Sequence, residues 1–240
     1  ALNMAFNNFH IVSGDITLTG ALNVKNNLTV NQAHGLLTNG YDVNVGGNFI
    51  APGIVVTSPA MITLNGTGSQ QLSMNAQLYN LKIDKPSGKV YLNGFNLTLN
   101  NKLVLKRGLI VCPGTTMVKF NPNTIIEGGS NQSCVVGPVW RDGYTAFTFP
   151  VGDTVAGDSS VYHPISLPAV PSGYIYTARY YAKNPLVDYP TYTAKASTLK
   201  GISTCEYWSL IRSWGTSTVA PTLSWNGNSC NINAFTDIRV

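Results

Sequence analysis

Side chains that could perform chemistry are sparse in this chain. Residues 1–137 contain four carboxylates for acid–base work: Asp15, Asp42, Asp84 and Glu127. Hydrolysis of a glycosidic bond needs two carboxylates roughly 5 to 9.5 Å apart. Asp42 and Asp84 are 42 residues apart, which is two turns if the chain winds with roughly 20 residues per turn, so their stacking stays open. The lysines on either side of Asp84, Lys82 and Lys85, favour a surface ion cluster instead.

Nucleophilic catalysis has no better support. The three histidines, His10, His34 and His163, stand near no obvious Ser or Cys partner, and no Gly-x-Ser-x-Gly motif occurs. His163 precedes Pro164 within an expected strand, which favours a packing role. We therefore predict no catalytic residues and expect a protein that is not an enzyme.

One loop could hold a cation. Asp153 and Asp158 lie in a Gly-containing stretch, 152–159, whose carboxylates could bind calcium. The stretch lacks the full ligand spacing of an EF-hand loop, and a plain surface loop is the simpler interpretation. Calcium is thus the only cofactor that the sequence suggests. Thr154, between Asp153 and Val155, matches a short Asp-Thr-apolar pattern typical of bacterial O-glycosylation.

Aromatic residues gather around an expected long loop, 184–200. Exposed rings can stack on sugar faces, although large rings are more often part of a core. The candidate glycan-binding residues are Tyr180, Tyr181, Tyr189, Tyr192 and Trp214.

Charged residues make up 10% of the chain, far below the roughly 25% typical of soluble domains. The net charge of +5 comes with one dense basic stretch: Lys82, Lys85, Lys89, Lys102, Lys106 and Arg107. No nucleic-acid reading motif accompanies it, so a solvated face is favoured over nucleic-acid binding. No stretch reaches the ~20 apolar residues of a membrane span, so no membrane insertion is expected.

Four cysteines are present: Cys112, Cys134, Cys205 and Cys230. None forms a Cys-x-x-Cys pair, which gives no support to a zinc or redox site. An even number in a weakly charged, Asn-rich chain fits an oxidising exterior and two disulfides. Three pairings are possible. Cys112–Cys134 and Cys205–Cys230 are favoured because each stays within one expected domain, and buried free thiols are the alternative.

Short apolar pairs recur at a fixed interval. Ile62 lies nineteen residues after Val43, and Leu81 lies nineteen residues after Ile62, with a further interval of nineteen from Leu99 to Val118. Alternating apolar residues mark strands with one buried face, and a period near 20 residues is typical of a β-solenoid. Residues 1–137 are therefore predicted to form a β-solenoid, with Asn side chains stacked between turns. A sandwich of hairpins is the alternative.

Composition changes near residue 138, since every Trp lies after it and most Asn lie before it. Longer, more aromatic strands are expected at 144–150, 162–167, 174–182, 205–212, 222–225 and 237–240. Pro and Gly clusters separate them, as in a Greek-key β-sandwich. The predicted fold class is thus all-β: a solenoid stalk, 1–137, followed by a sandwich, 138–240. The last strand reads as cut short, which predicts a sandwich truncated at its C-terminal end.

Several segments follow one another in a specific order along the chain. The first are 63–71 (Thr-Leu-Asn-Gly-Thr-Gly-Ser-Gln-Gln) and 78–84 (Leu-Tyr-Asn-Leu-Lys-Ile-Asp). Further segments follow at 147–153, 162–165, 206–208, 223–225 and 237–240. In this order they resemble Bacteroidetes-type adhesin-like cell-surface proteins exported by the type IX secretion system. His163 stands where these proteins more often have Arg. The resemblance implies an extracellular or cell-surface location and an adhesive or structural role, and it implies no catalytic residues.

Three functions remain as expectations. The first is a non-catalytic structural or adhesive module with a rigid stalk, whose partners are surface glycans or further copies of itself. Head-to-tail self-assembly follows if a solenoid end is uncapped, because its strand edges stay unpaired. The second is a carbohydrate-binding module of a secreted polysaccharide-degrading protein. The third is a β-helical polysaccharide lyase or hydrolase, which requires a carboxylate pair in one groove.

Overall fold

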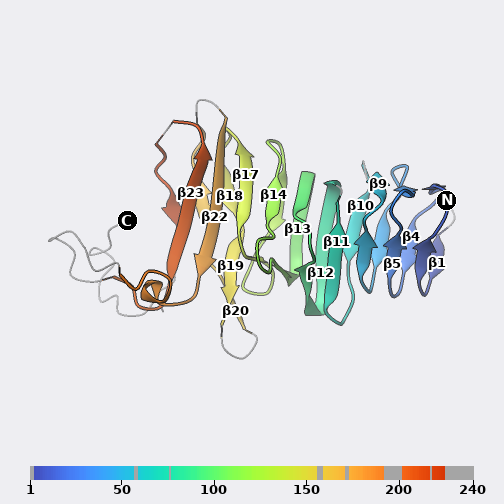
Figure 1. The fold of residues 1–240 in the computed structure, drawn as a ribbon, viewed down its shortest axis with the longest axis horizontal. Coiled ribbons are helices and arrows are strands. Elements are labelled where there is room, and N and C mark those ends of the chain that lie inside the picture. The colour runs from blue at the N-terminus through green and yellow to red at the C-terminus, as the bar shows by residue number, and fades with distance from the viewer. Residues whose placement is uncertain are drawn as a thin grey trace.

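The chain is all-β and winds into a β-solenoid of about six turns, so the predicted winding is confirmed. The computed structural model describes residues 3–56, 59–75, 77–155, 159–170, 173–191, 202–216 and 218–224. The strands stack side by side along the long axis of the molecule, with the first turn at one end and the antiparallel strands at the other (Figure 1).

Each solenoid turn contributes one strand segment to each of three parallel columns. The first column consists of β1 (Met4–Phe6), β4 (Leu22–Val24), β7 (Val43–Val45), β10 (Met61–Leu64), parts of β12 (Gln77–Leu92) and β13 (Leu97–Val111), and β15 (Ile125–Gly128). The second consists of β2 (Phe9–Ile11), β5 (Leu28–Val30), β8 (Phe49–Ala51), β11 (Gln70–Met74), the ends of β12 and β13, β16 (Val135–Val136) and β19 (Val151–Thr154). The third consists of β3 (Ile16–Thr17), β6 (Gly35–Leu37), β9 (Ile54–Val56), the starts of β12 and β13, β14 (Val118–Phe120) and β17 (Val139–Gly143).

Alternation along each strand fills the interior. In the first column, apolar side chains of successive turns lie in register and are 0% exposed: Leu22, Val43, Ile62, Leu81 and Leu103. Each turn covers the apolar face of the next, and burial of one such side chain contributes roughly 1.5–3 kcal/mol. The core therefore forms only when turns stack.

The register corrects part of the predicted spacing. Val43 pairs with Ile62, and Ile62 with Leu81, at the expected interval of nineteen residues. Other turns are longer, as between Leu22 and Val43, which are 21 residues apart. Leu97 pairs with Val118 and Leu99 with Phe120, so the interval there is 21 residues, and the equal spacing of Leu99 and Val118 is coincidental.

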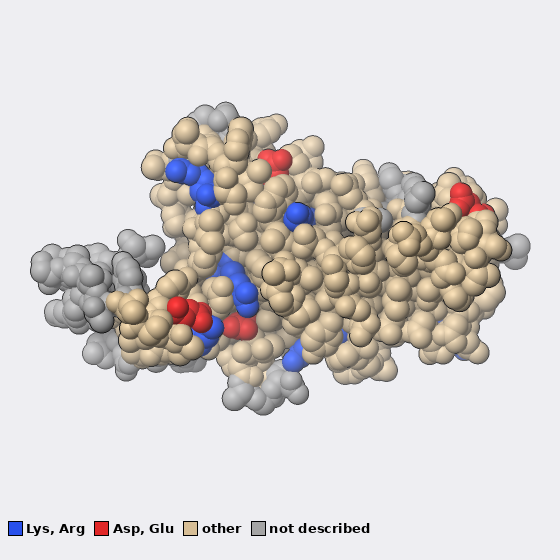
Figure 2. Space-filling view, viewed as in Figure 1, with Lys and Arg blue, Asp and Glu red and all other residues tan. Residues whose placement is uncertain are grey.

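Stacked amides satisfy polar groups between turns, as predicted. The Asn44 amide donates to Asn23 Oδ1 at 2.8 Å, and the Asn101 amide donates to Asn80 Oδ1 at 2.6 Å. Along another line, Asn27 Oδ1 accepts from the Asn48 backbone N–H, and Asn48 Oδ1 accepts from the Gln71 N–H, each at 2.8 Å. These bonds need no charge. Figure 2 shows the early turns almost bare of charged side chains, which gather toward the C-terminal half.

Beyond β17 the pairings are antiparallel, apart from the parallel pairing of β19 with β16. β17 pairs antiparallel with β22 (Tyr174–Tyr181), which pairs antiparallel with β23 (Tyr207–Trp214). β20 (Ser160–Tyr162) pairs antiparallel with β19. A separate antiparallel sheet contains β18 (Phe147–Phe149), β21 (Ile165–Leu167) and β24 (Thr222–Leu223). We call β18 and β20 to β24 the antiparallel cap. The predicted Greek-key sandwich is not confirmed.

The cap and the solenoid share one hydrophobic core. Val135 and Val139 of the last turn pack in the same buried cluster as Phe149, Ile165 and Tyr176. The expected boundary at residues 137 and 138 thus falls inside a continuous sheet. Among the described residues, no helix is long and apolar enough to cross a membrane.

Candidate functional sites

Two of the five candidate glycan-binding residues lie together at one end of the antiparallel cap. The Tyr181 ring on β22 stacks on the Tyr207 ring of β23, with centroids 4.4 Å apart and planes 9° apart. Tyr189 meets Tyr207 edge-on at 6.0 Å. Tyr207 was not among the predicted residues, because its position beside Tyr181 depends on the pairing of β22 with β23.

Protein groups already occupy much of this cluster. The Arg179 guanidinium lies 4.5 Å from the centroid of the Tyr181 ring, and the Lys183 ammonium 5.3 Å from it. Asp188 accepts hydrogen bonds from Lys183, at 2.7 Å, and from the Tyr207 hydroxyl. These two donors hold the pKa of Asp188 below its usual range.

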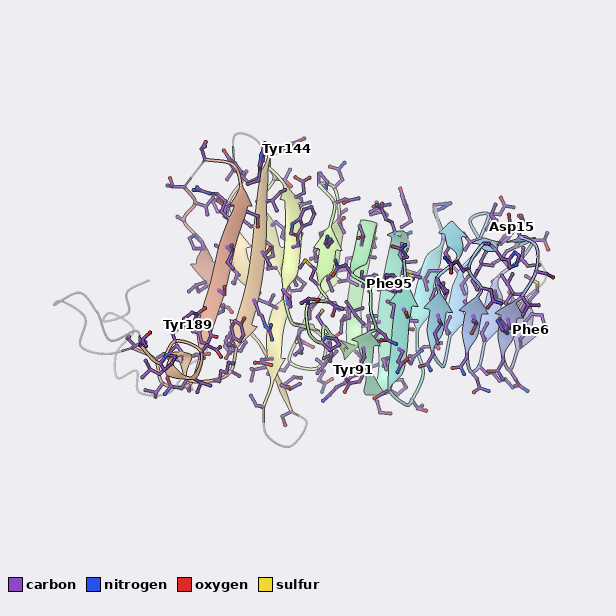
Figure 3. All side chains as sticks on the ribbon, viewed as in Figure 1. Phe6, Asp15, Tyr91, Phe95, Tyr144 and Tyr189 are labelled. Carbon is purple, nitrogen blue, oxygen red and sulfur yellow. The ribbon has the colours of Figure 1, made fainter. Side chains whose placement is uncertain are left out.

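The contacts fasten the segment 183–189, which contains the short 3-10 helix η2 (Pro185–Val187), to the sheet. Asn184 caps η2 by accepting from the Leu186 N–H at 2.9 Å. Among the three rings of this cluster, Tyr189 has the largest exposed surface, 52%, and Figure 3 shows it in the C-terminal part of the molecule, near β23.

Tyr180 is buried, at 3% exposure, and presents no ring face at the surface. Its hydroxyl donates to Glu206 Oε2 at 2.6 Å, and burial followed by this bond raises the Tyr180 pKa. The His163 ring packs 4.6 Å from Tyr180, with Nε2 3.9 Å from Glu206 Oε2. The Trp208 indole donates to the His163 carbonyl at 3.2 Å. These four residues form a buried polar cluster, and the expected packing role of His163 is confirmed.

The remaining aromatic candidates lie elsewhere. Trp214 is 63% exposed at the far end of β23, opposite Ile175, whereas Tyr207 begins the same strand. An eight-residue strand is roughly 23 Å long, so Trp214 and Tyr189 belong to separate surfaces. Tyr192 lies outside the described residues.

The calcium candidate is only partly described, because Asp158 lies outside the described residues. Asp153 lies in β19, where Oδ1 accepts from the Thr154 N–H at 2.8 Å and Oδ2 accepts from the Ala182 N–H at 3.0 Å. Asp153 thus ties the β19 hairpin to the end of β22. Within the described ranges, no group of three or more His, Cys, Asp and Glu is placed to hold a metal ion. Thr154 is half-buried and pairs with Ser160.

The predicted Cys112–Cys134 disulfide is wrong, since both thiols are free and buried. Alternation explains why. Cys112 points into the main core with Ile110, whereas Cys134 lies on the other face of the sheet with Leu109 and Val136. Burial raises the pKa of both thiols to about 12. The Cys205–Cys230 pairing stays a prediction, because Cys230 lies outside the described residues.

Asp42 and Asp84, the two acids that the sequence left as a possible stacked pair, do not meet. Asp42 precedes the first-column strand β7 and accepts from the Met61 N–H at 2.9 Å. Asp84 follows the first-column segment of β12, so the two acids lie at opposite ends of the strands in that column. Asp84 binds Lys106 at 2.9 Å and Arg107 at 2.7 Å, and these bonds lower its pKa to about 2. A surface ion cluster around Asp84 is therefore observed, with Lys82, Lys106 and Arg107, but Lys85, which the sequence placed in it, is not a member.

The sequence analysis did not foresee that one charged side chain, Lys85, is buried. Lys85 is 1% exposed, and its ammonium donates to the carbonyls of Gly66 and Gly68 and to Gln70 Oε1 at 2.6–2.9 Å. Burial lowers its pKa to about 8. Alternation carried the signal, since Leu81, Ile83 and Lys85 share one parity and the first two point inward.

Comparison of the chain with known proteins found no matching family model, curated protein or solved structure.

Proposed function

We propose that this chain is a non-catalytic structural and adhesive module that works outside a bacterial cell. The unbroken stacking of parallel strands from β1 to β17 around one core is the observation that supports this proposal most directly. Such stacking makes a stiff body, because each strand is held on both sides by hydrogen bonds and by packed side chains. A stiff spacer with polar, weakly charged sides suits the display of a contact surface away from its anchor.

The polar exterior supports the extracellular part of the proposal. At exposed positions, Asn side chains bond to the next turn, from Asn27 to Asn48 and from Asn48 to Gln71. The resemblance to type IX export substrates points to the same location, and the carboxylates Asp42 and Asp84, held apart, give no support to a polysaccharide-cleaving activity.

Small-angle scattering combined with an adhesion assay tests this function. The monomer should scatter as an elongated particle, and beads coated with it should be retained on glycan-bearing surfaces in the presence of a chelator. A compact scattering profile would refute the spacer, and reproducible release of sugar fragments from a polysaccharide panel would refute the non-catalytic assignment.

A carbohydrate-binding module is the second candidate, and the exposed Tyr189 ring beside Tyr207 favours it. Tyr189→Ala should then abolish retention on a glycan array while Tyr144→Ala, which removes another exposed ring, leaves it intact. Equal retention by both variants would reject this site.

Self-association is a further part of the proposal. The first turn leaves one edge of β1 without a partner strand among the described residues, and Phe6, Val12 and Ile16 are exposed there. Sedimentation over a range of concentrations should show larger species that Phe6→Ser reduces. A single species at every concentration would contradict self-association through this edge.

A further inference from the structure

The sheet formed by β17, β22 and β23 has one face on the core and one face outward. Residues that lie opposite each other in paired strands point to the same face. Along β22, buried residues alternate with half-buried ones that point outward, among them Ile175 and Thr177. Thr177 lies between Trp140 of β17 and Ile211 of β23. Ile175 lies opposite Trp214. The two indole rings and Ile211 therefore share the outer face.

Two of these apolar side chains are largely open to solvent. Trp214 is 63% exposed and Ile211 is 58% exposed, although large apolar side chains are mostly buried in folded proteins. They are neighbours on the outer side of β23, because a register shift between Ile175 and Tyr176 places Trp214 opposite Ile175. Exposed apolar groups that adjoin one another in this way mark a contact surface.

The two indole rings stand a short distance apart on this face. Trp140 and Trp214 are two strands apart and, counted from Thr177 to Ile175, two residues apart along the strands. Strand spacing and residue rise place their Cα atoms about 12 Å from each other, which is comparable to the length of a disaccharide unit. Trp140 is half-buried, with the Lys119 ammonium 5.6 Å from its ring centroid, so it offers a smaller surface than Trp214.

The polar groups of this face suit an uncharged ligand. Thr177 and Ser209 carry hydroxyl groups that can both donate and accept hydrogen bonds. The charged side chains that point the same way from β14, β17 and β22 are Lys119, Asp142 and Arg179. They carry both signs, and a surface of mixed sign does not attract a polyanion as a single-sign patch does.

The other end of the face is closed to stacking. Tyr181 and Tyr207 cover each other's rings at 4.4 Å. Arg179 and Lys183 also lie within 4.5 and 5.3 Å of the Tyr181 ring centroid. The rings that remain open to a ligand are thus those at the Trp214 end of the sheet.

The face is too small for a stable contact between two copies of the protein. β22 is eight residues long, and three strands of that length cover roughly 370 Å². Stable protein–protein interfaces bury about 800 Å² on each partner. A single polymer chain covers only a narrow strip, so the available area is sufficient for one.

We propose that this sheet face binds an extended, uncharged polysaccharide chain, with Trp140 and Trp214 stacking on its sugar rings and Ile211 packing beside them. Thr177 and Ser209 exchange hydrogen bonds with its hydroxyl groups. The inference rests on the proposed adhesive role, for which it names a ligand class and a surface separate from the Tyr189 site.

Co-sedimentation of the whole chain with insoluble cellulose, chitin and mannan tests the proposal. At least one of these polymers should bind, with an affinity that high salt changes little, because no ion pair is formed. Trp214→Ala should weaken binding about fivefold, and Trp140→Ala combined with Trp214→Ala about tenfold or more. Trp214→Phe keeps an aromatic ring and should retain most of the affinity.

Phe95→Ala is the matched control, because it removes an exposed ring of the solenoid. Circular dichroism of each variant checks that the fold is kept, and the exposed position of Trp214 makes unfolding of Trp214→Ala unexpected. Equal losses in Phe95→Ala and Trp214→Ala, tighter binding of dextran sulfate than of the neutral polymers, or no binding of any neutral polymer would each overturn the proposal. A dimer that Trp214→Ala dissociates would overturn it in favour of a second copy.

The same variants separate this surface from the adhesive role itself. If beads coated with the double Trp variant are still retained on glycan-bearing surfaces, the sheet face is excluded and the adhesive role stands. Loss of retention in Tyr189→Ala alone would assign binding to the tyrosine cluster instead. Scattering on the same samples reports separately on the rod.

Discussion

The solenoid and the antiparallel cap share one core but satisfy their polar groups differently. In the solenoid, amides of successive turns bond to one another at the surface, as between Asn23 and Asn44. In the cap, the polar groups of Glu206, Tyr180 and His163 meet inside. Repetition provides each turn with an identical polar partner one step away, whereas strands that reverse direction must bring together groups from distant parts of the chain.

The largest effect should come from deleting a buried ring in either region. Phe49→Ala in the solenoid and Phe149→Ala in the cap both remove fully buried rings, and each should lower the free energy of unfolding by about 3–5 kcal/mol. Because the core is continuous, both should shift one common transition in chemical denaturation. Two separate transitions would show instead that the regions unfold as independent domains. Phe95→Ala, at a partly exposed site, should cost far less.

The buried polar cluster of the cap offers a second test. Glu206→Ala leaves the buried Tyr180 hydroxyl without its acceptor and should cost about 1–3 kcal/mol. Tyr180→Phe in the same chain should recover part of that loss, since the hydroxyl is then absent. Denaturation of both single variants and the double variant measures the coupling, and additive losses would contradict the link.

Lys85 brings a buried charge into the solenoid and should make its stability depend on alkaline pH. Its folded pKa of about 8 lies below the unfolded value of 10.5, so the unfolded state binds more protons between these values. Wild-type stability should therefore rise relative to Lys85→Met as pH increases from about 8 to about 10.5. Thermal unfolding across this range measures the difference. A constant difference would mean that the ammonium is better stabilised than its burial indicates.

Asp84 should show a dependence of the same sign, but in acid: stability rises with pH there too. Its pKa falls from 3.8 unfolded to about 2 folded. The stabilisation is fully present above pH 3.8 and is lost as pH falls toward 2. Asp84→Asn should cost about 1 kcal/mol at neutral pH, because solvent screens the half-exposed Lys106 and Arg107. The cost should vanish near pH 2 and shrink in high salt, while Asp15→Asn, at an exposed site of the first turn, serves as the control.

The smallest effect should come from the stacked amides. Asn48→Ala removes the acceptor of the Gln71 N–H and should cost about 0.5–1.5 kcal/mol. Asn123→Ala changes an exposed amide outside the stack and should stay within about 0.5 kcal/mol of wild type. Equal costs at both sites would show that stacking adds nothing to stability.

The solenoid was predictable from the sequence because its apolar residues recur at a regular interval. Val43, Ile62 and Leu81 share one interval, and a shared interval is what stacking in register requires. The cap was not, since β17 pairs with β22 in reverse and no periodicity links them. Alternation along β22 buries Tyr180 on the same side as Ala178, which the choice of Tyr180 as an exposed ring did not take into account.

The predicted positions of side chains were wrong where the alternation of inward and outward residues along a strand was not considered. Cys112 and Cys134 were paired on the basis of domain membership, yet they lie on opposite faces of one sheet. Lys85 was grouped with its charged neighbours although it shares the inward parity of Ile83. Tyr207 could not be found by parity at all, because its stacking on Tyr181 depends on the register of two strands.

Because neighbouring turns stack in register, the solenoid can be shortened or lengthened only by complete turns. Val43 and Ile62 hold equivalent places, so excising residues 43–61 would join Asp42 to Ile62 and leave every remaining side chain on its original side. Removing one residue fewer would shift the next strand by one residue, so that its buried side chains would face the solvent and its exposed ones the core. The length of the solenoid can thus be changed by deleting or duplicating complete turns.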